Sequence, residues 1–183
     1  MRRSMRICSG GLMAVKQKTV DRIKTLLLLV LGCWSAAGAA DPPDGWSFHP
    51  LDEALEIAGK EEQRVFLYFG RHGCPSCERT NRESFSDPRV MQEYNANYVL
   101  AYVDSESGKR LRLPSGERIT EMELGVRLKV IGTPFFYYME PNGAPILRAP
   151  GYQSAEELLL FDRFVDEGHY KDQTFSEFKA SNS

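Results

Sequence analysis

The feature that most constrains this 183-residue chain is Cys74-Pro75-Ser76-Cys77, which closely follows the apolar run at residues 65–69. The run predicts a buried strand, and Pro75 suits the first turn of a helix, where its missing N–H costs nothing. Unpaired backbone N–H groups at a helix start favour a thiolate at the first sulfur. The sequence therefore predicts a redox-active dithiol or disulfide at a strand-to-helix junction, with Cys74 as the nucleophile.

Two other uses of paired cysteines have less support. A structural zinc site needs two further ligands at similar spacing, and the chain offers only three scattered histidines: His49, His72 and His169. Inert core cysteines do not usually have a glycine and a proline beside them, as Gly73 and Pro75 lie here. The sequence favours thiol chemistry, with no metal ligand and no cofactor.

The first 40 residues have the composition of a secretory signal peptide. Seven Lys or Arg residues and one Asp precede the apolar stretch 26–31, and small residues follow it up to Ala39. We expect cleavage after Ala39, and we assign residues 1–40 to the signal peptide and residues 41–183 to one exported domain. The alternative is a membrane-anchored lipoprotein, because Val30-Leu31-Gly32-Cys33 resembles a lipidation signal and Cys33 would then carry the lipid. Membrane contact is expected only in that case.

Removal of this leader changes the charge and cysteine content of the chain. Its seven basic residues and one Asp, taken from totals of 23 Lys/Arg and 25 Asp/Glu, leave 16 basic and 24 acidic residues, a net charge near −8. Nucleic acid is therefore not an expected partner. Of the four cysteines, only Cys74 and Cys77 remain, in a compartment where thiols tend to be oxidised. A disulfide that closes so small a loop stabilises little, so stability alone does not explain the pair.

The hydrophobic patterns predict alternating helices and strands. Helices are expected at 51–58, from Pro75 to before Ser86, at 88–94, at 119–128, after Ser154 through 165, and within 170–178; strands are expected at 65–69, 98–103, 135–139 and 146–149. The last two strands flank Asn142-Gly143, a strong hairpin signal, and residues 105–116 read as a surface loop. In the helix at 119–128, Ile119, Met122, Val126 and the neighbouring Leu residues have helical spacing. Helical crossovers followed by a hairpin predict a mixed sheet with helices on both faces.

This order of motifs resembles the thioredoxin superfamily over about residues 46–179, from the strand before Cys74 through Ile131-Gly132-Thr133-Pro134 to the last helix. The resemblance implies an α/β, thioredoxin-like fold with a central mixed sheet and an extra C-terminal helix. It also implies a cis peptide bond before Pro134, beside the cysteines. The backbone at Thr133 and Pro134 would then bind the substrate chain as an added strand.

A closer resemblance is to exported bacterial thioredoxins of the SoxW type. The matching motifs are Val130-Ile131-Gly132-Thr133-Pro134, Pro150-Gly151-Tyr152, and Gly168-His169-Tyr170-Lys171 leading into Thr174-Phe175-Ser176-Glu177-Phe178. This resemblance implies a periplasmic reductant that receives electrons from a membrane thiol-transport protein and reduces disulfides of partner proteins. The alternatives that stay open are a thiol oxidant or isomerase, a reductase in cytochrome c maturation, and a non-catalytic binding module such as a metallochaperone.

Two residues depart from the thioredoxin pattern. Thioredoxins usually carry a buried Asp on the strand before the cysteines, whereas residues 65–69 contain no acid and Tyr68 stands about where it would be. The Trp that commonly precedes the first cysteine is replaced by Arg71-His72-Gly73. Arg71 and His72 are candidates for favouring the Cys74 thiolate, although such an Arg is more commonly solvated.

Overall fold

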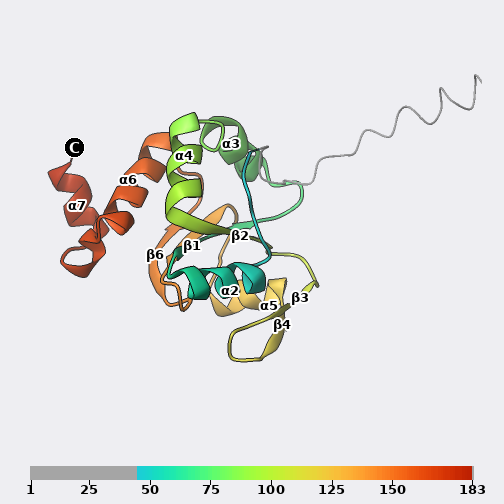
Figure 1. Ribbon diagram of the computed structural model, residues 1–183. Coiled ribbons are helices and arrows are strands. Elements are labelled where there is room, and N and C mark those ends of the chain that lie inside the picture. Colours follow the sequence, from blue (N-terminus) through green and yellow to red (C-terminus); the bar gives the residue numbers. More distant parts are fainter. Residues whose placement is uncertain (1–44, 183) are drawn as a thin grey trace, which may run out of the picture. The chain divides into compact units, whose positions relative to one another are not determined.

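The strand expected before the cysteines is β1 (Arg64–Gly70), and the sheet is built around it. In the computed structural model, which describes residues 45–182, β1 pairs in parallel with β2 (Tyr98–Asp104) and antiparallel with β5 (Phe135–Met139) (Figure 1). β5 in turn pairs antiparallel with β6 (Pro145–Pro150), so the strand order is β2-β1-β5-β6. Since β1 is paired on both sides and covered on both faces, all its residues except the first are buried, which explains its continuous apolar run.

The connections between the strands follow from their directions. Parallel β1 and β2 need a crossover, which is made by α3 (Pro75–Glu83) and α4 (Pro88–Asn97). Antiparallel β5 and β6 are joined by a tight turn in which Gly143 adopts a φ of +82° and its N–H donates to the Glu140 carbonyl, 2.8 Å away. That backbone conformation is easy only for glycine, so the Asn-Gly hairpin prediction is confirmed.

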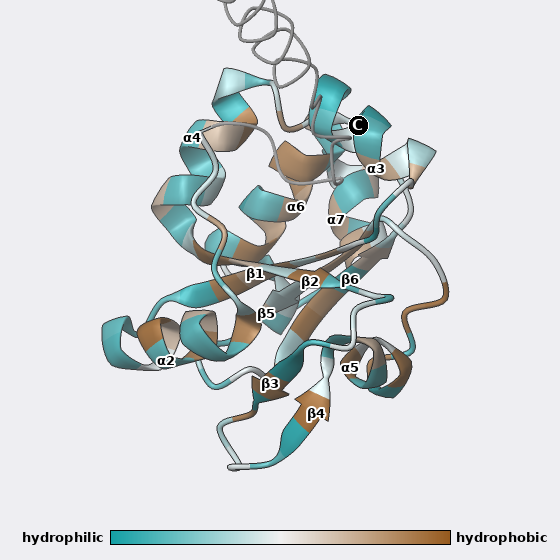
Figure 2. Cartoon of the chain, turned by 90° about the vertical axis from the view of Figure 1, so that its right-hand side faces the viewer, coloured by the Kyte–Doolittle hydropathy of each residue, from teal (hydrophilic) through white to brown (hydrophobic). Residues whose placement is uncertain are grey.

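Helices cover both faces of the sheet (Figure 2). Side chains from α3, α4, α6 (Ala155–Asp166) and α7 (Phe175–Ser181) pack with Phe66 and Tyr68 on one face. On the other face, α2 (Leu51–Glu61) and α5 (Glu121–Arg127) pack with the alternate residues of β1. A short 3₁₀ turn, η1 (His169–Lys171), links α6 to α7. The predicted mixed sheet, with helices on both faces and an extra C-terminal helix, is confirmed.

The surface loop predicted at residues 105–116 is wrong in part, because the chain forms a small hairpin there. β3 (Arg110–Arg112) pairs antiparallel with β4 (Arg118–Thr120), and Ile119, expected in a helix, lies buried in β4. The helix begins only at Glu121, since Thr120 and Glu123 form a reciprocal capping box at its start. The sequence did not predict these strands because each has only three residues. Each strand buries a single residue, Leu111 in β3 and Ile119 in β4, which is too little to give a hydrophobic pattern.

The apolar face predicted for α5 is wrong in part, because Leu124 is buried as expected but Met122 and Val126 are not. Met122 is 50% exposed and Val126 is 75% exposed, whereas Leu124 and Gly125 are buried. A Cβ atom at Gly125 would lie 3.9 Å from the ring of Phe69, an ordinary contact distance, so this position faces the sheet. The helix therefore docks through Leu124 and Gly125, and Met122 and Val126 face away from the core.

The predicted signal peptide, its cleavage after Ala39 and the lipidation of Cys33 lie outside the described residues. Within residues 45–182, no helix has the length and apolar character needed to cross a membrane.

Buried tyrosines on the α4/α6 side of the sheet differ in whether their hydroxyls are paired. Tyr94 donates to the carbonyl of Leu158 at 2.9 Å, so Tyr138, 2.5 Å from the Tyr94 hydroxyl, is the donor in that contact. The hydroxyl of Tyr68 is also buried, but it has no hydrogen-bond partner among the described residues. Hydrogen bonds therefore offset the cost of removing the Tyr94 and Tyr138 hydroxyls from water, whereas nothing offsets that cost for the Tyr68 hydroxyl among the described residues.

We expect Tyr94→Phe to lower the free energy of unfolding by about 1–3 kcal/mol, because it leaves the Tyr138 hydroxyl and the Leu158 carbonyl without this partner. Tyr68→Phe is the matched control: it also removes one buried hydroxyl, and it should leave stability unchanged or raise it. Urea unfolding of the disulfide-intact protein measures both. Equal losses in the two variants would contradict the assigned pairing.

Candidate redox site

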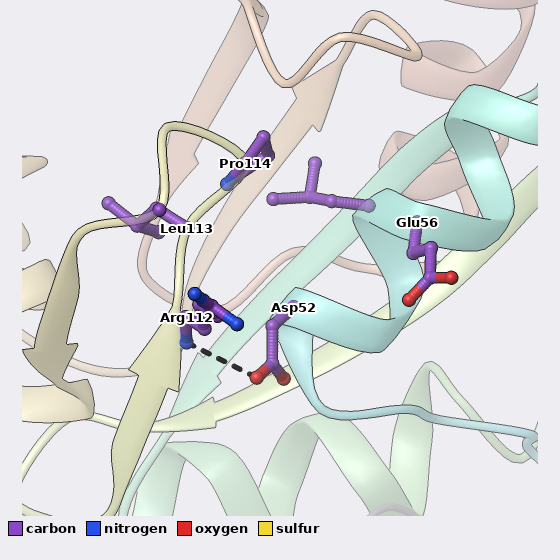
Figure 3. A pocket seen from close by; sticks show the side chains of 7 residues that line it. Asp52, Glu56, Arg112, Leu113 and Pro114 are labelled. Carbon is purple, nitrogen blue, oxygen red and sulfur yellow. Dashed lines mark hydrogen bonds between the residues drawn. The ribbon is translucent and has the colours of Figure 1, made fainter.

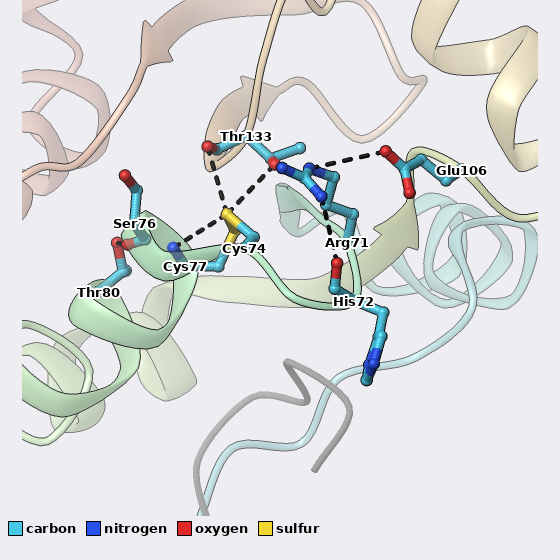
Figure 4. Close-up of a disulfide and its surroundings, with 8 residues drawn as sticks. All are labelled: Arg71, His72, Cys74, Ser76, Cys77, Thr80, Glu106 and Thr133. Atoms are coloured by element: carbon cyan, nitrogen blue, oxygen red, sulfur yellow. Dashed lines mark hydrogen bonds and ion pairs between the residues drawn. A yellow bond between two sulfur atoms is a disulfide. The ribbon is translucent and has the colours of Figure 1, made fainter. Parts of the chain in front are cut away.

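The two cysteines lie at the junction between β1 and α3 (Figure 4). Cys74 is the residue that caps the start of α3, Pro75 occupies the first turn, and Cys77 follows one turn later. Their sulfurs form a disulfide, with the Cα atoms 5.2 Å apart. Cys74 is 2% exposed and Cys77 is fully buried, so any attack from solvent in the oxidised state must come at the Cys74 side.

Three polar groups surround the sulfur of Cys74. The backbone N–H of Cys77 donates to this sulfur at 3.1 Å and the hydroxyl of Thr133 donates at 3.3 Å, while the carbonyl oxygen of Thr133 lies 3.4 Å away (Figure 4). In the reduced protein, the two donors would stabilise a thiolate at Cys74, and the carbonyl can accept from a protonated thiol. The geometry therefore favours ionisation of the first cysteine over the second.

Thr133 reaches Cys74 because of how its loop enters β5. The Thr133–Pro134 peptide bond is cis, in agreement with the resemblance. The carbonyl of Pro134 accepts a hydrogen bond from the N–H of Gly151 at 2.8 Å, which ties the loop to the end of β6. The structure thus brings Cys74, Cys77, Thr133 and Pro134 together, as the sequence predicts.

Tyr68 shares a buried cluster with both cysteines and packs against the rings of Phe85, Tyr102 and Phe136, with centroids 5.2–5.4 Å away. Burial raises the pKa of Tyr68 well above the ordinary phenol value, so this side chain stays neutral and cannot act as a base near neutral pH. A phenol therefore takes the place expected for a buried carboxylate.

Three contacts near the site were not anticipated from the sequence. Arg71 pairs loosely with Glu106, with Nε and Oε1 3.7 Å apart, so its charge is not directed at Cys74 alone.

Tyr152 stacks on the guanidinium of Arg79 at 3.8 Å and donates to Glu83 at 3.0 Å. Tyr152 thus fastens α3 to the loop after β6, a structural role for a motif that the sequence singled out only by resemblance.

A separate pocket lies between α2 and the β3–β4 hairpin (Figure 3). Its lining includes Asp52, Glu56 and Arg112, and the Arg112 backbone N–H donates to the Asp52 carboxylate at 3.2 Å. It contains no cysteine or histidine, so it offers nothing to thiol chemistry. Over the described part of the chain, no group of three or more His, Cys, Asp or Glu side chains is arranged to hold a metal ion.

Comparison with solved structures gives thioredoxin folds. A thioredoxin from Thermus thermophilus is 30% identical over 66% of this chain and 87% of its own, with a TM-score of 0.55. A Bacteroides thetaiotaomicron protein described as a candidate disulphide-isomerase is 25% identical, covering 68% and 95%, with a TM-score of 0.53. A thioredoxin-fold protein from Helicobacter pylori, at 22% identity, covers 66% and 82% with a TM-score of 0.58 and supports the fold alone.

A comparison with curated protein sequences gives no significant match. Residues 51–163, in contrast, match the thioredoxin-like domain family, and this span includes both cysteines and the Thr133–Pro134 loop. Since the match covers more than half of the chain, the protein belongs to the thioredoxin-like domain family, with thiol–disulfide exchange as the chemistry of its cysteine pair.

Proposed function

We propose that this protein is an exported thiol–disulfide oxidoreductase that reduces disulfides of periplasmic partner proteins through Cys74 and Cys77. The observation that carries the proposal is the pair of donors on the Cys74 sulfur, the Cys77 N–H and the Thr133 hydroxyl. A thiolate is the reactive form of cysteine, and these groups stabilise it at the sulfur that borders the surface. Membership of the thioredoxin-like family supports the same chemistry.

The reaction takes place in two exchanges. The Cys74 thiolate attacks one sulfur of the partner disulfide, so a mixed disulfide forms and the other partner sulfur leaves as a thiolate that takes up a proton. Cys77 then loses its proton and attacks the Cys74 sulfur, which releases the second partner thiolate. The partner gains two electrons and two protons, and the Cys74–Cys77 disulfide is formed.

A further cycle needs an external dithiol to reduce that disulfide. We propose a membrane thiol-transport protein as this donor, in keeping with the resemblance to exported thioredoxins of the SoxW type. Export itself rests on the leader at residues 1–40, and a lipid on Cys33 would keep the protein at the membrane. Detection of a mature N-terminus at residue 40, or of a lipid on Cys33, distinguishes the two forms.

The direction of electron flow can be measured from the equilibrium of the Cys74–Cys77 pair with a glutathione buffer. We expect a reduction potential near that of thioredoxin, about −270 mV, because two neutral donors stabilise the thiolate and, within residues 45–182, no cationic side chain hydrogen-bonds the sulfur. A value near −120 mV, which is typical of a strong periplasmic oxidant, would overturn the reductant proposal and favour the oxidant or isomerase.

Replacement of Thr133 by Val tests the role of its hydroxyl. The change keeps the side-chain shape and removes one donor from the Cys74 sulfur, so the thiolate should be less stable. We expect the reduced variant to react with iodoacetamide at pH 7 about tenfold more slowly than the wild type, with the difference vanishing at high pH, where both thiols are ionised. Ser86→Ala, which removes an exposed hydroxyl bonded to Arg82 on α3, is the control. Unchanged alkylation in Thr133→Val would show that this contact does not stabilise the thiolate.

Removal of the resolving thiol tests the order of attack. Cys77→Ala should accumulate a mixed disulfide between Cys74 and a partner protein in the exported fraction, because the second exchange cannot occur. Cys74→Ala should trap none, since Cys77 is fully buried. Non-reducing electrophoresis and mass spectrometry identify the bridged cysteine. Trapping through Cys77 would reverse the assignment, and a complete absence of mixed disulfides would leave a non-catalytic binding module as the better description.

A further inference from the structure

One buried carboxylate away from the dithiol makes no hydrogen bond. The side chain of Glu121, the first residue of α5, is only 6% exposed, and within residues 45–182 its carboxylate accepts no hydrogen bond. Its ion pair with Lys109 spans 3.9 Å between Oε1 and Nζ, which is too long for a hydrogen bond. A buried charge is costly unless it is both paired and hydrogen-bonded.

The start of a helix does not explain this burial. A negative side chain in the first turn favours a helix, but an exposed carboxylate gives the same benefit without loss of hydration. Glu123 already serves that role in α5, because it completes the capping box with Thr120. The carboxylate of Glu121 therefore suits binding better than it suits folding.

Glu121 lines a pocket of about 410 Å³ beside β2. This volume falls within the range of about 300–1,000 Å³ that small-molecule sites have. The rings of Trp46, Phe48 and Tyr102 also line the pocket, together with the charged side chain of Lys109. None of the lining residues is a cysteine or belongs to the loop of Thr133, so the pocket is separate from the redox site.

The aromatic wall before α2 is held by hydrogen bonds. The segment that carries it runs alongside β2, where the His49 N–H donates to the Leu100 carbonyl at 2.9 Å and the Tyr102 N–H donates to the His49 carbonyl at 3.0 Å. The indole N–H of Trp46 donates to the carbonyl of Phe85 at 2.9 Å, and the two rings lie 4.4 Å apart. The ring of Trp46 is therefore fixed before any ligand arrives.

The position of Tyr102 depends on a glycine at the end of β1. A Cβ atom on Gly70 would lie 2.8 Å from the hydroxyl oxygen of Tyr102, closer than such atoms can approach. The ring of Tyr102 also packs edge-on against Tyr68, with centroids 5.2 Å apart. Two sides of the pocket are thus set by the fold.

A planar cation with several N–H groups matches this combination of groups. Aromatic faces attract cations, and a guanidinium can stack on a ring while two of its N–H groups bond one carboxylate. The ammonium of Lys109 does not fill this role, since its side chain is 57% exposed and leaves Glu121 without a hydrogen bond. The net charge near −8 expected for residues 41–183 also attracts cations.

We infer that this pocket binds a guanidinium group on an apolar stem, with Glu121 as the hydrogen-bond acceptor and Lys109 displaced into solvent. The guanidinium belongs either to a free small molecule or to an arginine side chain of a bound protein, and the chemistry is the same in both. The inference does not depend on the proposed function, because neither cysteine takes part.

The test compares three blocked amino acids by calorimetry with the whole protein: the N-acetyl methylamides of arginine, of its neutral isostere citrulline, and of lysine. We expect arginine to bind at least about tenfold more tightly than citrulline, the difference expected for a charged hydrogen-bond partner, and more tightly than lysine. Equal binding of arginine and citrulline, or no binding of arginine, would overturn the inference.

Propylguanidinium, which lacks the peptide groups, distinguishes the two sources of the ligand. An affinity equal to that of the arginine compound supports a free small molecule. A much weaker affinity supports an arginine within a protein chain, because the flanking peptide groups then contribute to binding.

Two variants of the pocket should change the affinity for the arginine compound in opposite directions. Glu121→Gln keeps the side-chain shape and should weaken binding about tenfold, because it removes the charge from the acceptor. Lys109→Gln removes the competing cation and should tighten binding about two- to fivefold. Asp172→Asn, at an exposed position after η1, is the control for net charge and should leave binding unchanged. Thermal unfolding checks that each variant folds.

The opposite pattern would assign the pocket to another ligand. Weaker binding in Lys109→Gln together with unchanged binding in Glu121→Gln would show that the ammonium, not the carboxylate, makes the contact, and would overturn the inference. Loss of the pocket in this way leaves the thiol chemistry of Cys74 and Cys77 untouched, so the two proposals fail separately.

Discussion

The antiparallel pairing of β1 with β5 is the constraint on which the site depends. Phe69, near the end of β1, lies opposite Phe135, the first residue of β5. The chain leaving β1 and the chain entering β5 must therefore meet at the same end of the sheet, and the first carries Cys74 while the second carries Thr133 and Pro134. Parallel pairing would have placed the loop before β5 at the opposite end of β1, far from the cysteines.

This arrangement makes one sulfur different from the other without a buried charge. Cys74 has the Cys77 N–H and the Thr133 hydroxyl as donors, whereas Cys77 lies in an apolar cluster beside the neutral phenol of Tyr68. Hydrogen bonds to the charged form favour ionisation, and apolar burial opposes it. The proposed order, attack by Cys74 and then resolution by Cys77, rests on that asymmetry.

Two segments near the dithiol are held in place by contacts that do not involve the cysteines. Tyr152 holds α3 through Arg79 and Glu83, so the helix that carries the cysteines is tied to the loop after β6. On α5, Leu124 and Gly125 make the contact with the sheet and leave Met122 and Val126 outside. The first contact fixes the helix that carries the cysteines, and the second fixes the helix that precedes the Thr133 loop.

Local sequence patterns, which act between residues close in the chain, were sufficient to predict much of this fold. Pro75 at the helix start, the Asn142-Gly143 turn and the apolar run of β1 act within a few residues, so the sequence alone determined the mixed α/β fold and the place of the dithiol. Only the tertiary structure decided the rest. The contact of Thr133 with Cys74 spans 59 residues, and the β3–β4 hairpin depends on burying Leu111 and Ile119. The outward direction of Met122 and Val126 follows from the docking of α5 through Leu124 and Gly125. Such contacts depend on which surfaces pack together, and hydrophobic spacing along one segment does not contain that information.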